Sequence, residues 1–198
     1  MSSVRTLSDT LPVEGRGRVG TAWWGMLCVI ATEAILFAYL IFSYAYLGTQ
    51  ARQWPSGGVP SLRLALPATV LLVASSVVLE WSKRAARREK MGRARLAVAM
   101  ALLMGLGFAA LELEEWKNTP FTLSTDSYSA IYFLLTGTHL FHVGAGLLGM
   151  ALLLAWSLSG RLAQGHDQHR TLVTVYWHFV DIVWLFVFAT IYLSPRLA

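Results

Sequence analysis

The sequence TLVTVYWHFVDIVWLFVFATIYL, residues 171–193, is an apolar stretch of helix length that contains one imidazole and one carboxyl group. A charged side chain at the centre of a bilayer costs at least about 2.5–3.5 kcal/mol, so such a residue is a functional-site candidate with a partner nearby. His178 and Asp181 are three residues apart, and we expect them to share a helical face and to pair with each other. The other helices must be arranged to accept this polar face.

The composition places the chain among membrane proteins. It has 198 residues, of which 56% are hydrophobic and 14% are charged, and its mean hydropathy is +0.53. Five apolar runs approach the roughly 20 residues that cross a hydrocarbon core of about 30 Å. These predicted spans cover residues 22–47, 64–82, 95–113, 128–157 and 172–194. We therefore predict an all-α integral membrane bundle of five transmembrane helices, with one membrane domain over 22–194.

The basic residues predict the orientation of this bundle. Seven of the 16 Lys and Arg residues lie in the connection 83–95, five more lie in the N-terminal arm and the fourth connection, and four lie on the opposite side. Positive charge collects on the cytoplasmic side, so we expect a cytoplasmic arm at 1–21 and a periplasmic tail at 195–198. The net charge of +5 then reflects orientation and contact with anionic lipid, and it does not indicate nucleic-acid binding.

Polar residues also interrupt the first and fourth spans. Glu33 lies about a dozen residues into the first span, and His139 and His142 share a face of the fourth. At about 1.5 Å per residue, Glu33, His142 and Asp181 all fall near the midplane of the membrane. We predict a buried polar network of Glu33, His139, His142, His178 and Asp181. Such a cluster could stabilise the helices, carry protons or bind a metal.

Four tryptophans are expected at an interface with lipid or a neighbouring subunit. Trp23 and Trp24 begin the first span, and Trp177 and Trp184 flank the polar pair of the last. Tryptophan is enriched where the membrane meets water because its ring is amphipathic.

The end of the third span carries the carboxyl groups of Glu112, Glu114 and Glu115, which we interpret as a solvated collar or a contact with a partner. Ser124, Thr125 and Asp126 precede the fourth span and are all good N-cap residues. The sequence contains no CxxC pair, HExxH motif, phosphate-binding loop or nucleophile elbow. We therefore predict no catalytic residue and no metal ligand set on this chain.

Four segments, in order, resemble subunit III of the haem-copper oxidases. TVYWHFVDIVWLFVFATIYL (174–193) is similar to the family's C-terminal helix, and WWGMLCVIATEAILFAYLIFSYAY (23–46) is similar to the helix with its intramembrane glutamate, matched here by Glu33. ALPATVLLVASSVVLEW (65–81) and YFLLTGTHLFHVGAG (132–146) resemble the next helix and the helix with two histidines. The chain resembles the five-helix form of bacterial oxidases, which lacks the first two helices of the longer form and the lipid cleft that they make.

The resemblance implies a non-catalytic subunit of a respiratory terminal oxidase in the bacterial inner membrane, and first of all of a cytochrome c oxidase. In this family the haem and copper lie on partner subunits. Subunit III packs directly against subunit I, in a complex with subunit II and a small subunit IV. The resemblance also implies contact with membrane lipids, a role for bound phospholipid, and support of proton uptake during O2 reduction.

Other functions stay open on the sequence. The same subunit form serves quinol oxidases, and a similar one accompanies nitric oxide reductases. A membrane b-type cytochrome would use His142 and His178 as haem ligands. A proton-relay transporter would use Glu33 and the histidines, but the chain shows no inverted repeat or broken helix.

Overall fold

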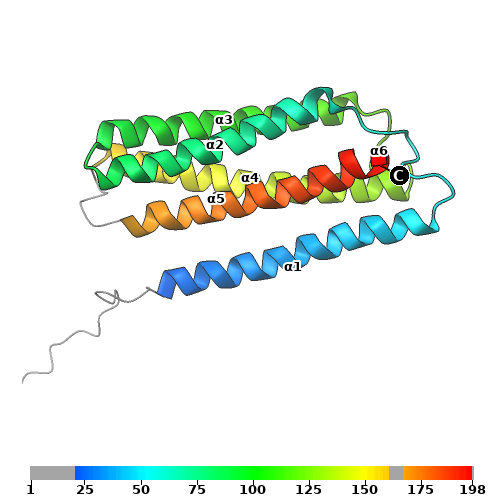
Figure 1. Ribbon diagram of the computed structural model, residues 1–198, viewed down its shortest axis with the longest axis horizontal. Helices are drawn as coiled ribbons and strands as arrows, with labels where there is room; N and C mark the ends of the chain where they lie inside the picture. The colour runs from blue at the N-terminus through cyan, green and yellow to red at the C-terminus, as the bar shows by residue number, and fades with distance from the viewer. Residues whose placement is uncertain (1–20, 161–166, 198) are drawn as a thin grey trace, which may run out of the picture.

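The computed structural model describes residues 21–160 and 167–197, which form a bundle of five long, alternately directed helices (Figure 1). The last helix continues through a π-helical turn, η1, into a short final turn, α6. The bounds are α1 Thr21–Gln50, α2 Leu62–Arg87, α3 Met91–Asn118, α4 Ser127–Leu158, α5 Asp167–Phe188, η1 Ala189–Leu193 and α6 Ser194–Leu197. Each of the five long helices is apolar enough to cross a membrane. The predicted all-α membrane bundle is confirmed.

Each long helix is longer than its predicted span when α5 is taken together with η1 and α6, which continue it. The third predicted span, 95–113, lies within α3, and the tail expected at 195–198 is helical as far as Leu197. The expected N-terminal arm lies outside the described residues, apart from Thr21. Polar helix ends reach beyond the hydrocarbon core, so hydropathy alone underestimates their length.

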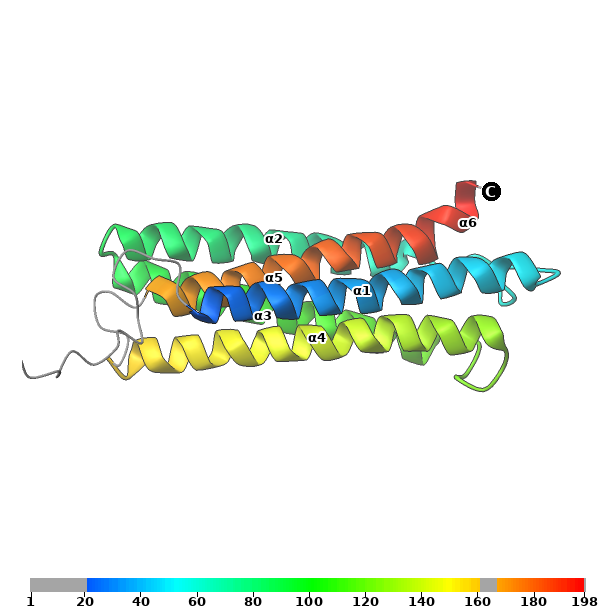
Figure 2. The ribbon, with the colours of Figure 1, turned by 90° about the horizontal axis from the view of Figure 1, so that it is seen from below.

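The helices are arranged as two packed pairs and one outlying helix. Figures 1 and 2 show α2 beside α3, α4 and α5 next to them, and α1 along the side of α4 and α5. The α2–α3 pair is the most extensive contact, and the Ser82 hydroxyl of α2 donates to the Ala94 carbonyl of α3 (3.0 Å). Alanines are buried on both helices, and small side chains allow backbones to approach closely within a membrane.

The outer surface of the bundle is apolar. Large hydrophobic side chains are exposed on every long helix, for example Ile35, Val77, Leu103, Phe141 and Phe186. An exposed apolar surface of this extent matches a hydrocarbon environment.

Side chains cap two of the helices. Ser61 caps α2 by accepting a hydrogen bond from the Arg63 N–H (3.2 Å). Asp126 caps α4 through a capping box, in which Asp126 Oδ1 accepts from the Ser129 N–H (2.8 Å) and the Ser129 hydroxyl reaches back to the Asp126 N–H (2.9 Å). Of the three residues predicted as possible caps, Asp126 is the one that caps α4. These bonds satisfy backbone donors that the first turn of a helix leaves free.

Candidate functional site

A polar contact about halfway along α1 joins Glu33 to His142 of α4. Glu33 Oε2 lies 3.0 Å from His142 Nε2, and the side chains are 31% and 8% exposed, respectively. Glu33 is 12 residues beyond Thr21, which places it about 18 Å along the helix axis. The two residues are 109 positions apart in the chain, so this contact ties the outlying helix to the bundle.

This contact contains a proton. His142 Nδ1 lies 2.7 Å from the Thr138 carbonyl oxygen, which can only accept, so Nδ1 carries a hydrogen. Nε2 of a neutral imidazole is then an acceptor, and it would face an acceptor if Glu33 were ionised. Either Glu33 donates its acid proton to Nε2, or a protonated His142 donates to the carboxylate. In both forms the pair holds one proton and has no net charge.

His139 is close to this pair but lies in an aromatic enclosure. Its ring is fully buried among Phe37, Phe108 and Trp184, with the Trp184 ring centroid 4.9 Å away. Neither ring nitrogen makes a hydrogen bond. An apolar enclosure of this kind disfavours a charged imidazole, so His139 packs as a neutral ring.

The interface predicted for the two C-terminal tryptophans is wrong, because Trp177 and Trp184 are both fully buried. Trp177 donates its indole N–H to Ser75 Oγ of α2 (2.8 Å), and Trp184 donates to Thr69 Oγ1 of the same helix (2.9 Å). Each ring therefore brings its polar atom to a partner inside the bundle, which removes the need for an interfacial position.

The two N-terminal tryptophans lie on the outside of the described bundle. Trp24 is 61% exposed, and Trp23 is partly exposed beside it. Their contact with lipid or a subunit stays a prediction.

The structure does not pair His178 with Asp181. His178 Nε2 instead lies 3.8 Å from Glu80 Oε2 of α2, and Glu80 also accepts from Lys83 Nζ (3.0 Å). Asp181 is buried near Ser76 of α2, and its Oδ1 makes no hydrogen bond. Both α5 side chains thus face α2, at different heights. Of the five residues predicted to form one network, direct hydrogen bonding joins Glu33 to His142 within the described residues.

The solvated collar expected at the end of α3 is wrong for two of its three carboxyl groups. Glu112 is fully buried and Glu115 is 8% exposed, whereas Glu114 is exposed and pairs with Lys117 (3.3 Å). The hydroxyl of Tyr192 donates to Glu115 Oε1 (2.6 Å). Neither oxygen of Glu112 makes a hydrogen bond.

Sequence reasoning missed this buried acidic group because it treated the helix end as solvent-exposed. The signal that could have revealed it is the three-residue spacing of Glu112 and Glu115, which puts both on one face while Glu114 points elsewhere.

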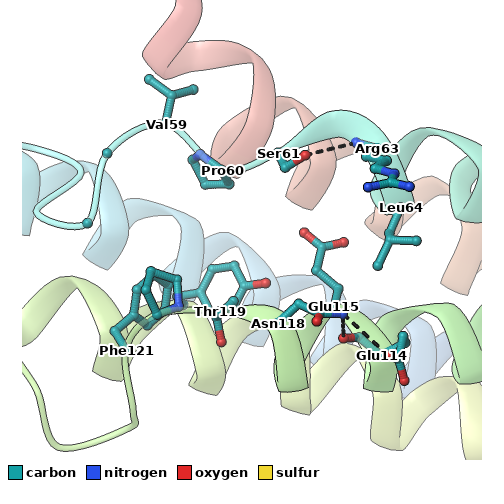
Figure 3. Close-up of a pocket in the computed structure, with 14 residues that line it drawn as sticks. Val59, Pro60, Ser61, Arg63, Leu64, Glu114, Glu115, Asn118, Thr119 and Phe121 are labelled. Atoms are coloured by element: carbon teal, nitrogen blue, oxygen red, sulfur yellow. Dashed lines mark hydrogen bonds between the residues drawn. The ribbon is translucent and has the colours of Figure 1, made fainter.

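A cavity of about 680 Å³ lies between the N-terminus of α2 and the C-terminus of α3. We call it the α2–α3 pocket and define it by Ser61, Arg63, Leu64, Glu115, Asn118 and Phe121, which are among its lining residues. In Figure 3 the Glu115 carboxyl group points from α3 toward the segment that enters α2. The pocket is lined by residues at the N-terminus of α2 and the C-terminus of α3. These helix ends lie opposite the basic α2–α3 connection (Figure 1).

Comparison with known proteins matches almost all of this architecture. The family described as "Cytochrome c oxidase subunit III" matches residues 17–195, which include all five long helices. The chain belongs to the cytochrome c oxidase subunit III family.

Relatives named "Cytochrome c oxidase subunit 3" support the assignment. The chain is 32% identical to the protein of Petromyzon marinus and 28% identical to that of Drosophila melanogaster, over 85% of this chain and 68% of each relative. It is 30% identical to the protein of Pongo pygmaeus, over 92% of this chain and 71% of the relative. The subunit III match therefore extends well beyond the quoted motifs.

The side chains of this subunit III homologue do not form a metal site in the part of the chain that the structure describes, where no group of three or more His, Cys, Asp or Glu residues is placed to hold an ion. Haem ligation by His142 also conflicts with the geometry. Both of its ring nitrogens are already engaged, by Thr138 and by Glu33, so neither offers a free lone pair.

Proposed function

We propose that this chain is the non-catalytic subunit III of a cytochrome c oxidase in the bacterial inner membrane. The observation that carries the proposal is the family match over residues 17–195, which spans the whole bundle. The complex that it joins is a proton-translocating oxidoreductase, and the haem and copper of that complex lie on partner subunits.

The proposed partners are subunit I, in direct contact, together with subunit II and a small subunit IV. The surface of α1 supports a partner or lipid on this side of the bundle. Phe37, Leu40 and Tyr44 are its buried residues, and no residue from 21 to 36 is buried within the described chain. The first half of α1, including Trp24, is therefore available for contact with a subunit or with lipid.

We assign different roles to the five predicted network residues. Glu33 and His142 together hold one proton within the membrane, which supports a role in proton uptake by the complex. His139, His178 and Asp181 position helices: His139 fills the aromatic enclosure, and the other two direct α5 toward α2.

Purification through a tag on this chain tests the assignment. Mass spectrometry of the copurifying proteins and a reduced-minus-oxidised spectrum should reveal subunit I with its haem. A copper-bearing subunit II would identify cytochrome c as the electron donor. Recovery of this chain alone with its own stoichiometric haem would overturn the proposal.

Two substitutions at Glu33 distinguish a role of this side chain in proton uptake from a role in helix packing. In Glu33→Gln the side-chain amide can still donate to His142 Nε2 but cannot ionise, whereas Glu33→Leu removes both properties. We expect the oxidase complexes that contain either variant to keep the wild-type haem spectrum. Glu33→Gln should keep wild-type assembly and slow proton uptake into proteoliposomes, and Glu33→Leu should also weaken retention of this chain in the complex. Wild-type proton uptake in Glu33→Gln would limit this contact to a packing role.

A further inference from the structure

Two buried carboxyl groups lie near the end of the bundle opposite the basic α2–α3 connection (Figure 1). Glu112 and Glu115, which we call the acid pair, are three residues apart on α3 and share one helical face. Neither oxygen of Glu112 makes a hydrogen bond, and Oε2 of Glu115 makes none either. The neighbouring indole of Trp116 donates its N–H to Thr136 (3.2 Å). Burying two carboxylates with so few donors is costly, so the acid pair opposes its own full ionisation.

The cations at this end of the bundle do not neutralise the acid pair. They are Arg63 of α2, Lys117 of α3 and Arg196 of α6. Arg63 is exposed on the wall of the α2–α3 pocket, Lys117 pairs with the exposed Glu114 (3.3 Å), and Arg196 donates to backbone carbonyl groups. Within the described residues, no ion pair joins a cation to either buried carboxyl group.

One tyrosine supplies the hydrogen bond that the acid pair does receive. The hydroxyl of Tyr192 donates to Glu115 Oε1 (2.6 Å). The other titratable neighbours are Tyr128 and Tyr132 of α4. A single neutral donor for four carboxyl oxygens favours one negative charge, on Glu115, and leaves Glu112 as the neutral acid.

The bond from Tyr192 also holds the C-terminal end of the chain. Tyr192 lies in the π-helical turn η1, which leads directly into α6. Arg196 of α6 donates to the carbonyl oxygen of Tyr192 and to that of Pro60, just before α2. We call the Glu115–Tyr192 bond, together with η1 and α6, the C-terminal clasp. It joins α3 to the end of α5 and to the segment that lines the α2–α3 pocket.

We propose that the acid pair binds one proton and that this proton keeps the C-terminal clasp closed. Glu112 holds the proton, and Glu115 carries the charge that accepts the Tyr192 hydroxyl. Loss of the proton places two like charges on one buried face of α3, where they repel each other and require water. The contact between Glu115 and Tyr192 then opens. This inference depends on the folded bundle and not on the proposed role in an oxidase.

A proton can reach the acid pair without an open cavity. Glu115 and Tyr132 both line the α2–α3 pocket. The Tyr132 hydroxyl lies 3.5 Å from the Tyr192 hydroxyl, which in turn donates to Glu115. These hydroxyl groups connect the pocket to the acid pair. The clasp therefore responds to the pH at the pocket end of the bundle, which the positive-inside rule predicts to be the outer side.

The pH dependence of unfolding tests the proton site on the full chain in detergent. In the unfolded chain both glutamates are ionised at neutral pH, so unfolding releases the proton that Glu112 holds. Stability should then fall as the pH rises, until Glu112 ionises in the folded chain too. For one proton, the unfolding equilibrium constant increases about tenfold per pH unit. Glu112→Gln cannot ionise and should lose this dependence, whereas the exposed control Glu114→Gln should keep it.

Hydrogen exchange locates the effect. Amides in peptides 189–197 and 58–64, compared with an unstructured peptide at the same pH, should exchange about tenfold faster once the clasp opens in alkali. Tyr192→Phe should show the fast exchange already at neutral pH, and Glu112→Gln should stay slow throughout. The infrared carbonyl band of a protonated carboxylic acid should be present in the wild type and in Glu114→Gln, and should be weaker in Glu112→Gln.

Three results would overturn the inference. They are an equal pH dependence of unfolding in the wild type and Glu112→Gln, an unchanged carboxylic acid band in Glu112→Gln, and exchange at 189–197 that does not respond to pH. If Glu112→Gln does not fold, exchange at 189–197 in the wild type and in Tyr192→Phe decides by itself.

Discussion

Position 146 requires glycine because Trp177 occupies the space that a side chain would fill. A Cβ atom on Gly146 would lie 2.5 Å from Cε3 of the Trp177 ring, and one on Gly105 of α3 would lie 2.9 Å from Cη2 of the same ring. The indole also donates to Ser75 of α2. One buried side chain of α5 thus sets how closely α2, α3 and α4 approach it.

Gly146→Ala should therefore lower the stability of the bundle. The rigid ring cannot move without breaking its hydrogen bond to Ser75, so we expect a loss of about 1–3 kcal/mol, as for other overpacked cores. Gly144→Ala is the control, because a Cβ there meets nothing within 4 Å. Thermal unfolding in detergent should show a lower midpoint for Gly146→Ala alone. Equal midpoints for the two variants would mean that α4 and α5 can move apart at Gly146 without a loss of stability.

A different expectation applies to Glu112, whose two buried oxygens make no hydrogen bond. Replacing an unpartnered buried acid with an apolar side chain of similar size removes a desolvation cost. Glu112→Leu should raise the free energy of unfolding of the isolated chain by about 1–3 kcal/mol. The exposed Glu114→Leu should change it little. A clear loss of stability in Glu112→Leu would reveal a partner for this carboxyl group.

Among the elements, α4 depends on its N-terminal cap. The backbone hydrogen bond from Ser129 holds the pKa of Asp126 below its usual value of 3.8. Because the pKa is lower in the folded chain, the cap stabilises fully above the unfolded value and is lost as the pH falls through the folded one. Asp126→Ala should cost about 0.5–2 kcal/mol at neutral pH.

Asp126→Asn provides the matched comparison for this effect. Asparagine caps nearly as well but does not titrate, so its contribution should not change between neutral and acidic pH. Unfolding midpoints of the three proteins at both pH values measure the effect. The difference in unfolding midpoint between the wild type and Asp126→Ala should be smaller at acidic pH than at neutral pH. A difference that does not change with pH would contradict the role of the ionised cap.

The elements also show what sequence patterns can establish. Hydropathy located all five spans, and the order Ser-Thr-Asp before residue 127 located the cap of α4, because both depend on local sequence. Partner choice between helices is not local. The three-residue spacing of His178 and Asp181 correctly puts them on one face, but only the packing of α2 decides that His178 meets Glu80. Likewise, the space for the Trp177 ring depends on two glycines, Gly105 on α3 and Gly146 on α4, that lie far apart in the sequence.

The whole molecule has two chemically different ends. The basic α2–α3 turn lies at one end, and the α1–α2 connection lies at the other (Figure 1). We predict from the positive-inside rule that the basic end is cytoplasmic. A membrane-impermeant maleimide should label Ser56→Cys in intact cells and Glu89→Cys only after permeabilisation, in a Cys28→Ser background. The reverse pattern would invert the orientation.

The long separation of Glu33 and His142 also has a consequence for biosynthesis. The ribosome makes α1 first, and 109 residues separate Glu33 from its partner. At about 5–20 residues per second, α1 waits roughly 5–20 s before α4 is complete. During that interval α1 lacks the contact that later ties Glu33 to His142. The outlying helix therefore joins the bundle only after α4 has been made.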